Sequence, residues 1–168
     1  MRNIELKARL RDWAKALCVC SELGTILHGD IRQTDTYFPV PEGRLKLRAS
    51  DPGEDYLVFY RRADLAGPKA CDYLIRPVDR SLRDLLAGAL GTLAVVEKTR
   101  TLFLWENVRI HLDRVEGLGE FIEFEAVLTD GYDETDGYRK LEKLEAAFEI
   151  AAEDRITISY LDMVTQDR

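Results

Sequence analysis

The sequence predicts an α+β fold in which eight antiparallel β-strands close into a barrel and helices pack on the outside. Three observations support this prediction. The chain contains eight strand-like segments, and most of them are joined by short turns rather than by crossover helices. Several of these segments also alternate charged with apolar residues. A closed barrel with a polar lumen gives the charged faces one shared interior and leaves the apolar faces to the helices.

The strand-like segments are rich in β-branched and aromatic residues or alternate in polarity, and they end at turn signals. Turns are indicated by Pro41-Glu42-Gly43, by Asp51-Pro52-Gly53 and by residues 116–119. The predicted strands are residues 2–10, 31–40, 44–49, 56–62, 71–77, 93–104, 107–114 and 120–128.

Four helices are predicted from apolar residues at helical spacing. Gly24 is a suitable C-terminal cap for the first helix. Ser81, followed three residues later by Asp84, resembles a capping box at the start of the second, which ends at Gly91. The predicted helices are residues 12–23, residues 82–90, residues 137–153 and a short last helix from about residue 159.

The bulk composition narrows the function. With 168 residues, the chain is interpreted as one domain spanning residues 1–168. A net charge of −7 argues against a nucleic-acid-binding protein, which usually carries a basic excess. Three cysteines without a paired framework indicate a reducing, cytoplasmic location. We expect neither a signal peptide nor a membrane span, and a homodimer is compatible with the sequence.

Charges on the alternating strands are sorted by sign. Side chains two residues apart share one face of a strand. The sorted sets are Arg44, Lys46 and Arg48 on one strand, Lys98 and Arg100 on another, Glu123 and Glu125 on a third, and Glu5 with Lys7 on the first. Each set alone could be a solvated strand face. If the faces converge, they build a basic cavity with a carboxylate cluster, suited to a polyphosphate and a divalent cation.

These residues resemble a known family. Asn3-Ile4-Glu5-Leu6-Lys7 is similar to the Glu-x-Glu-x-Lys strand of the CYTH superfamily, the triphosphate tunnel metalloenzymes. Residues 33–38 and 43–48 look like its second and third strands. The most specific match is VRIHLDRVEGLGEFIEFE, residues 108–125. The resemblance covers nearly the whole chain, and the class IV adenylate cyclase-like branch fits best.

The resemblance implies an eight-stranded tunnel that holds a triphosphate together with Mg or Mn. By motif position, the implied metal ligands are Glu5, Asp113, Glu123 and Glu125. The implied phosphate-binding residues are Lys7, Arg44, Lys46, Arg48, Arg61, Lys98, Arg100 and Arg109, with Arg44 at the tunnel mouth. The four carboxylates and Arg61 are the implied catalytic residues. His111 is interpreted as a wall residue rather than a ligand.

Two positions depart from the family pattern. Asn3 replaces the first Glu of the motif, which removes a carboxylate but keeps an oxygen ligand. Arg61 stands where the family often has Lys, and Arg cannot act as a base. The expected function is a metal-dependent enzyme, either a class IV adenylate cyclase or a triphosphate hydrolase. Its substrate would be ATP, inorganic tripolyphosphate or thiamine triphosphate, and no nucleic acid or membrane partner is expected. The alternative is a catalytically weak polyphosphate or nucleotide sensor.

Overall fold

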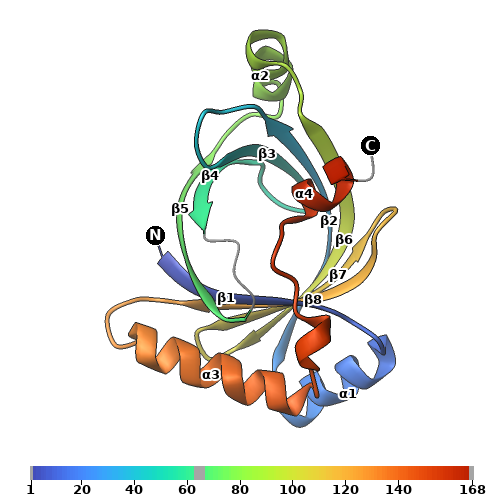
Figure 1. The fold of residues 1–168 in the computed structure, drawn as a ribbon, viewed down its shortest axis with the longest axis vertical. Helices are drawn as coiled ribbons and strands as arrows, with labels where there is room; N and C mark the ends of the chain where they lie inside the picture. Colours follow the sequence, from blue (N-terminus) through green and yellow to red (C-terminus); the bar gives the residue numbers. More distant parts are fainter. Residues whose placement is uncertain (1, 63–66, 167–168) are drawn as a thin grey trace.

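Eight antiparallel strands form a closed barrel in the computed structural model, which describes residues 2–62 and 67–166 (Figure 1). Around the barrel the order is β1-β5-β4-β3-β2-β6-β7-β8. The strands are β1 (Arg2–Arg9), β2 (Ile26–Phe38), β3 (Arg44–Asp51), β4 (Tyr56–Arg62), β5 (Lys69–Pro77), β6 (Ala94–Trp105), β7 (Val108–Val115) and β8 (Gly119–Val127). The predicted eight-stranded antiparallel barrel is confirmed.

Alternation along the strands separates an apolar outer face from a polar lumen. On β1, Ile4 and Leu6 are fully buried on the outside, whereas Glu5 and Lys7 line the lumen. The outer side chains of β1, β7 and β8 form one apolar core with two helices. Burial of each such aliphatic side chain stabilises the folded state by about 1.5–3 kcal/mol relative to an exposed side chain.

Two helices cover this apolar face, as predicted. They are α1 (Trp13–Glu22) and α3 (Glu134–Ala147), and both lie below β1 and β8 in Figure 1. Side-chain caps define their starts. Asp12 accepts a hydrogen bond from the Lys15 amide, and Asp133 accepts one from the Asp136 amide. Against the predicted 137–153, α3 begins and ends earlier, and a 3₁₀ turn (Ala152–Asp154) follows it.

The second predicted helix does not behave as expected. α2 (Leu82–Leu90) forms, but none of its residues is buried, and Leu85 is 65% exposed. It stands away from the barrel at the top of Figure 1. The expected capping box is also wrong. Ser81 has helical backbone angles and makes no side-chain cap, while Asp79 accepts a hydrogen bond from the Ser81 amide. Within the described residues, no helix is long and apolar enough to cross a membrane.

The last helix lies across one end of the barrel, rather than along the apolar face that α1 and α3 cover. α4 (Tyr160–Gln166) follows a segment that crosses the ring of strands in Figure 1. Tyr160, Leu161 and Met163 form a second apolar core with Tyr37, Phe121 and other barrel residues. At the opposite end, exposure rises along the lumen face of β5, from 5% at Cys71 to half-buried Ile75. As far as the described residues show, the lumen is therefore a pocket that α4 closes at one end and that is open at the other.

Strand β2 is longer than predicted. It begins at Ile26 rather than at residue 31, and a bulge between Leu27 and Gly29 interrupts its pairing with β6. Gly29 has a φ of 131°, which favours glycine. Ile26 and Leu27 are 69% and 60% exposed. No buried face therefore imposes an alternating pattern on this first part of the strand.

Candidate functional site

The lumen holds a cavity whose ionisable side chains come from five strands. Nine of the sequence-predicted site residues line it: Glu5, Lys7, Lys46, Arg48, Lys98, Arg100, Arg109, Glu123 and Glu125. They share one barrel interior because each has the inward parity of its strand. The sorted charges thus do converge, and the solvated-face interpretation is wrong for these strands.

One cluster of cations is organised by a carboxylate that the sequence analysis did not single out. Asp35 on β2 is 1% exposed and accepts hydrogen bonds from Lys46 at 2.7 Å and from Arg48 at 2.7 and 2.8 Å. Burial opposes ionisation of Asp35, but the charges of Arg48 and Lys46 hold its pKa well below the ordinary value. Asp35 therefore fixes both cations in position facing the lumen.

A second cluster surrounds Asp113. Arg100 donates to both of its carboxylate oxygens at 2.7 Å, and the Tyr160 hydroxyl donates at 3.0 Å. The Lys98 ammonium lies 3.4 Å away. Asp113 is fully buried and is not among the residues that line the cavity. The structure therefore does not place Asp113 with the other implied metal ligands; it orients Arg100 instead.

Two buried lysines have unusually low pKa values. Burial, and then the charge of Arg100, lower the pKa of Lys98 to about 7. Burial, and then the charge of Arg48, lower the pKa of Lys46 to about 8. Both ammonium groups are destabilised in the absence of an anion, because the nearby carboxylates only partly offset the loss of water. An anionic ligand would relieve this destabilisation.

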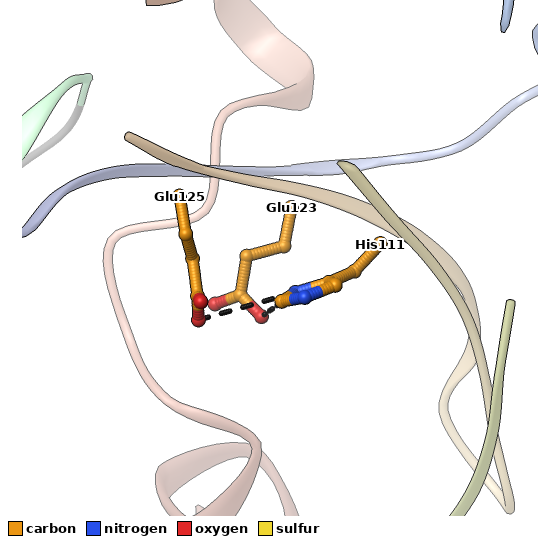
Figure 2. Close-up of side chains that lie close together, drawn as sticks. All are labelled: His111, Glu123 and Glu125. Atoms are coloured by element: carbon orange, nitrogen blue, oxygen red, sulfur yellow. Dashed lines mark ion pairs between the residues drawn. The ribbon is translucent and has the colours of Figure 1, made fainter. Parts of the chain in front are cut away.

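Carboxylates and one imidazole meet on the β7–β8 side of the lumen (Figure 2). His111, Glu123 and Glu125 each offer a ligand atom within 4.8 Å of the others. The His111 Nδ1 atom is buried and makes no hydrogen bond. Glu123 is also 3.3 Å from Lys7 and 2.8 Å from Arg100. Burial opposes its ionisation, but the charges of Lys7 and Arg100 hold the pKa of Glu123 well below the ordinary value.

Strand β1 completes the acidic side. Glu5 lies directly opposite Glu125 in the β1–β8 ladder, and Lys7 lies opposite Glu123. Two like charges in opposite positions destabilise a sheet unless a cation lies between them. Asn3, one step along the same face, lines the cavity, and its buried Oδ1 atom has no hydrogen-bond partner. Carboxylate and amide oxygen atoms are the ligands that hard divalent cations prefer.

Two predicted phosphate-binding arginines lie outside the cavity. The lumen face of β4 carries Val58 and Tyr60, so Arg61 points outward; it is exposed and lies 3.5 Å from Glu42. Arg44 lies near α4, at the closed end rather than at the mouth, and donates to Asp162 at 2.8 Å. The structure therefore does not bring Arg61 or Arg44 together with the other cations.

Tyr160 is a further lumen residue whose role was not predicted from the sequence. Its ring lies 3.8 Å from the Lys7 ammonium and 5.1 Å from that of Lys98, and its hydroxyl binds Asp113. Favourable cation–π contacts with both lysines help to hold them at the closed end of the lumen. Tyr160 is 47 positions from Asp113 along the chain, so only the path of the C-terminal segment brings the two residues together.

Comparison with known proteins agrees with this geometry. The family model of the CYTH domain matches residues 1–160. This chain belongs to the CYTH family. A protein of Methanocaldococcus jannaschii described as a candidate adenylate cyclase is 24% identical over 97% of this chain and 98% of its own.

Solved structures with the same fold come from several organisms. A protein from Pyrococcus horikoshii superimposes with a TM-score of 0.85 at 23% identity, covering 95% of this chain and 98% of its own. A candidate adenylyl cyclase from Hippeastrum, described with a dominant triphosphatase activity, has a TM-score of 0.67 at 16% identity and covers 99% of this chain and 96% of its own. At these identities the likeness establishes the fold.

Proposed function

We propose that this CYTH protein binds a triphosphate together with a divalent cation in its lumen and cleaves a phosphoanhydride bond. The observation that carries the proposal is the composition of one cavity. Six cations line it beside three carboxylates. Buried Asp35 holds Lys46 and Arg48 in place, and buried Asp113 holds Arg100. Preorganised cations stabilise charge that develops on phosphate oxygens during phosphoryl transfer.

The phosphate chain would occupy the closed half of the lumen. Lys7, Lys46 and Lys98 are all buried there, within reach of the Tyr37 or Tyr160 ring. Arg48 and Arg100 present planar guanidinium groups that can each hold two phosphate oxygens. Because Asp35 and Asp113 already hold these arginines in place, little side-chain entropy is lost when the ligand binds.

The acidic side fits a divalent cation. Glu123, Glu125 and His111 are the proposed ligands, with Glu5 and the unpartnered Asn3 oxygen on the neighbouring strand. A divalent cation bound there would neutralise charge on the reacting phosphate group and make its phosphorus more electrophilic. We leave Asp113 out of this set because its oxygens are occupied by Arg100 and Tyr160.

Two reactions are compatible with this site. In a cyclase, the 3′ hydroxyl of ATP attacks the α-phosphorus and pyrophosphate leaves. In a hydrolase, water attacks the terminal phosphorus, the bond to the bridging oxygen breaks, the diphosphate part of the substrate leaves, and the transferred phosphoryl group becomes orthophosphate. The relatives support both, since one is described as a candidate adenylate cyclase and another with a dominant triphosphatase activity. The alternative to an enzyme is a sensor protein that binds a polyphosphate or nucleotide without cleaving it.

Product analysis tests the proposal. The protein is incubated with ATP, tripolyphosphate or thiamine triphosphate and with Mg²⁺ or Mn²⁺. Cyclic AMP with pyrophosphate indicates the cyclase, and orthophosphate the hydrolase. Thermal unfolding is followed in parallel, because a ligand at a hundredfold excess over its Kd stabilises the fold by about 2.7 kcal/mol. Stabilisation without product would favour the sensor, and no stabilisation at millimolar ligand would contradict the proposed site.

Glu125→Gln tests the acidic group within the same assay. Its side chain is only 17% exposed and lies 3.9 Å from His111. The substitution removes one negative charge and keeps the shape, so we expect metal-dependent turnover to fall by at least about tenfold. Glu120→Gln is the matched control, because Glu120 lies on the same strand but pairs with surface residue Arg114. Equal loss in both variants would argue against a metal-binding role.

A further inference from the structure

The lumen has one uncharged side. Among the described residues that line the cavity, those from β4 and β5 carry no carboxylate, ammonium or guanidinium group; they are Val58, Tyr60, Cys71, Tyr73 and Ile75. Val58 lies opposite Ile75 in the β4–β5 ladder, and Tyr60 lies opposite Tyr73. These four side chains therefore form a continuous apolar and aromatic wall, which we call the β4–β5 wall.

The β4–β5 wall reaches the open mouth of the pocket. Cys71 is buried, whereas Tyr73, Ile75 and Val58 are half-buried. Across the lumen lies Arg109 on β7, whose side chain is 46% exposed. Burial raises the pKa of Tyr73, and the charge of Arg109 opposes that rise, so the two side chains lie near each other on the mouth side of the lumen. The deepest cations lie toward the other end, beneath Tyr160.

A ligand that fills this pocket must be amphipathic. Inorganic tripolyphosphate carries charge along its whole length, and its oxygens would lie against Val58 and Ile75 without hydrogen-bond donors. A phosphate chain attached to a flat ring matches both parts of the cavity. The phosphates meet the buried cations, and the ring meets two tyrosine rings and two aliphatic side chains near the mouth.

We propose that the β4–β5 wall binds the heteroaromatic ring of an organic triphosphate, so that the substrate is a nucleoside-triphosphate-like ester rather than inorganic tripolyphosphate. This inference rests on the proposed function, because it assumes that the phosphates occupy the basic half of the same lumen. Ile75, Val58 and Tyr73 then determine specificity without touching the phosphate groups.

Isothermal titration with ATP, thiamine triphosphate and tripolyphosphate tests the inference on the whole protein with metal present. Tripolyphosphate has at least as much charge as either ester, so electrostatic attraction alone does not favour the esters. We expect at least one ester to bind about tenfold more tightly than tripolyphosphate, because its ring loses contact with water. Tripolyphosphate binding as tightly as both esters would overturn the inference while leaving the proposed function intact. Binding of none of the three would instead contradict the proposed function.

Ile75→Ala and Val58→Ala locate the effect. Each should weaken the preferred ester by about tenfold and leave tripolyphosphate affinity within about twofold, since only the ring contact is shortened. Leu74→Ala is the matched control, because Leu74 is the neighbour of Ile75 on β5 and points outward, 60% exposed. Circular dichroism shows whether each variant is folded. If one of the two wall variants does not fold, the other still tests the inference. An equal weakening of ester and tripolyphosphate would contradict the assignment of the wall.

Discussion

The Nδ1 atom of His111 lies 3.5 Å from Oε2 of Glu123, and 3.9 Å from Oε1 of Glu125, yet it makes no hydrogen bond (Figure 2). Burial, and then the charge of Arg100, lower the pKa of His111 below its ordinary value, so the imidazole is neutral near pH 7. A neutral imidazole beside two carboxylates is a nitrogen ligand that Mn²⁺ accepts more readily than Mg²⁺ does.

From this relationship we predict that the protein binds Mn²⁺ more tightly than Mg²⁺ and that His111 contributes to the difference. His111→Gln should weaken Mn²⁺ binding on the order of tenfold and Mg²⁺ binding much less. Mn²⁺ affinity is measured by electron paramagnetic resonance, with Mg²⁺ as competitor. His28→Gln serves as the control because His28 is exposed. The same small loss for both metals would mean that His111 is only a wall residue, as the sequence analysis interpreted it.

Asp113 should matter for stability and for the position of Arg100 rather than for metal binding. Asp113→Asn removes the charge that pairs with buried Arg100 and Lys98, which we expect to lower the free energy of unfolding by about 3 kcal/mol. Tyr160→Phe removes one hydrogen bond to the same carboxylate and should cost about 1 kcal/mol. Urea denaturation measures both values. In each variant that folds, the affinity for Mn²⁺ should stay near that of the parent protein. A large loss of Mn²⁺ affinity in Asp113→Asn would indicate that Asp113 is a metal ligand after all.

The sequence predicted the barrel well because charged residues reveal strand parity. On β3, β6 and β8, the alternation of Lys46, Lys98 or Glu123 with apolar neighbours identifies the face that points into the lumen. Strand β4 has apolar residues on both faces, so its sequence does not indicate which face points into the lumen. Arg61 was therefore predicted to be a lumen residue from its motif position alone. The lumen residues of β4 are Val58 and Tyr60.

Buried partners of the predicted cations were harder to foresee. Asp35 lies between two threonines in a strand that also carries Gln33 and Tyr37, which gives no sign that its carboxylate is buried. The position of Tyr160 in the lumen depends on how the C-terminal segment crosses the barrel. This path is a long-range feature that the local sequence pattern does not indicate. α2 formed without burying its leucine stripe because spacing predicts a helix but does not supply the surface that would cover it.

The buried lysines predict that triphosphate binding takes up protons. Lys98 has a pKa of about 7 and is therefore largely neutral at pH 8, whereas Lys46, with a pKa of about 8, is partly neutral. A bound anion favours their charged forms and raises both pKa values, so affinity should fall as pH rises from 7.5 to 9. Calorimetry in two buffers with different ionisation enthalpies should show uptake of about one proton or more at pH 8.

Substitution by arginine separates the contribution of Lys98. Arg stays charged at every pH in this range, so Lys98→Arg should reduce the proton uptake and flatten the pH dependence. Lys143→Arg, on the exposed side of α3, should change neither quantity. Proton uptake that is equal in all three proteins would show that Lys98 does not change its ionisation when the ligand binds.

Asn3 provides the sharpest test of where the cation binds. Its buried Oδ1 atom has no partner, and it shares the lumen face of β1 with Glu5, which lies opposite Glu125. Asn3→Glu would place another carboxylate in this acidic group. Without metal the added charge should destabilise the fold by like-charge repulsion. With Mg²⁺ or Mn²⁺ the same charge should tighten binding, because hard cations prefer anionic oxygen.

We therefore expect the melting temperature of Asn3→Glu to fall below that of the parent in a chelator and to rise more steeply with added metal. The linkage between binding and stability gives the size of the rise, about 1.4 kcal/mol for each tenfold gain in affinity at saturating metal. Asn3→Gln is the control, since it lengthens the side chain without adding charge. If the Asn3→Glu and Asn3→Gln proteins respond to metal as the parent does, position 3 lies outside the metal site, and the match of the first strand to the Glu-x-Glu-x-Lys motif does not extend to metal binding.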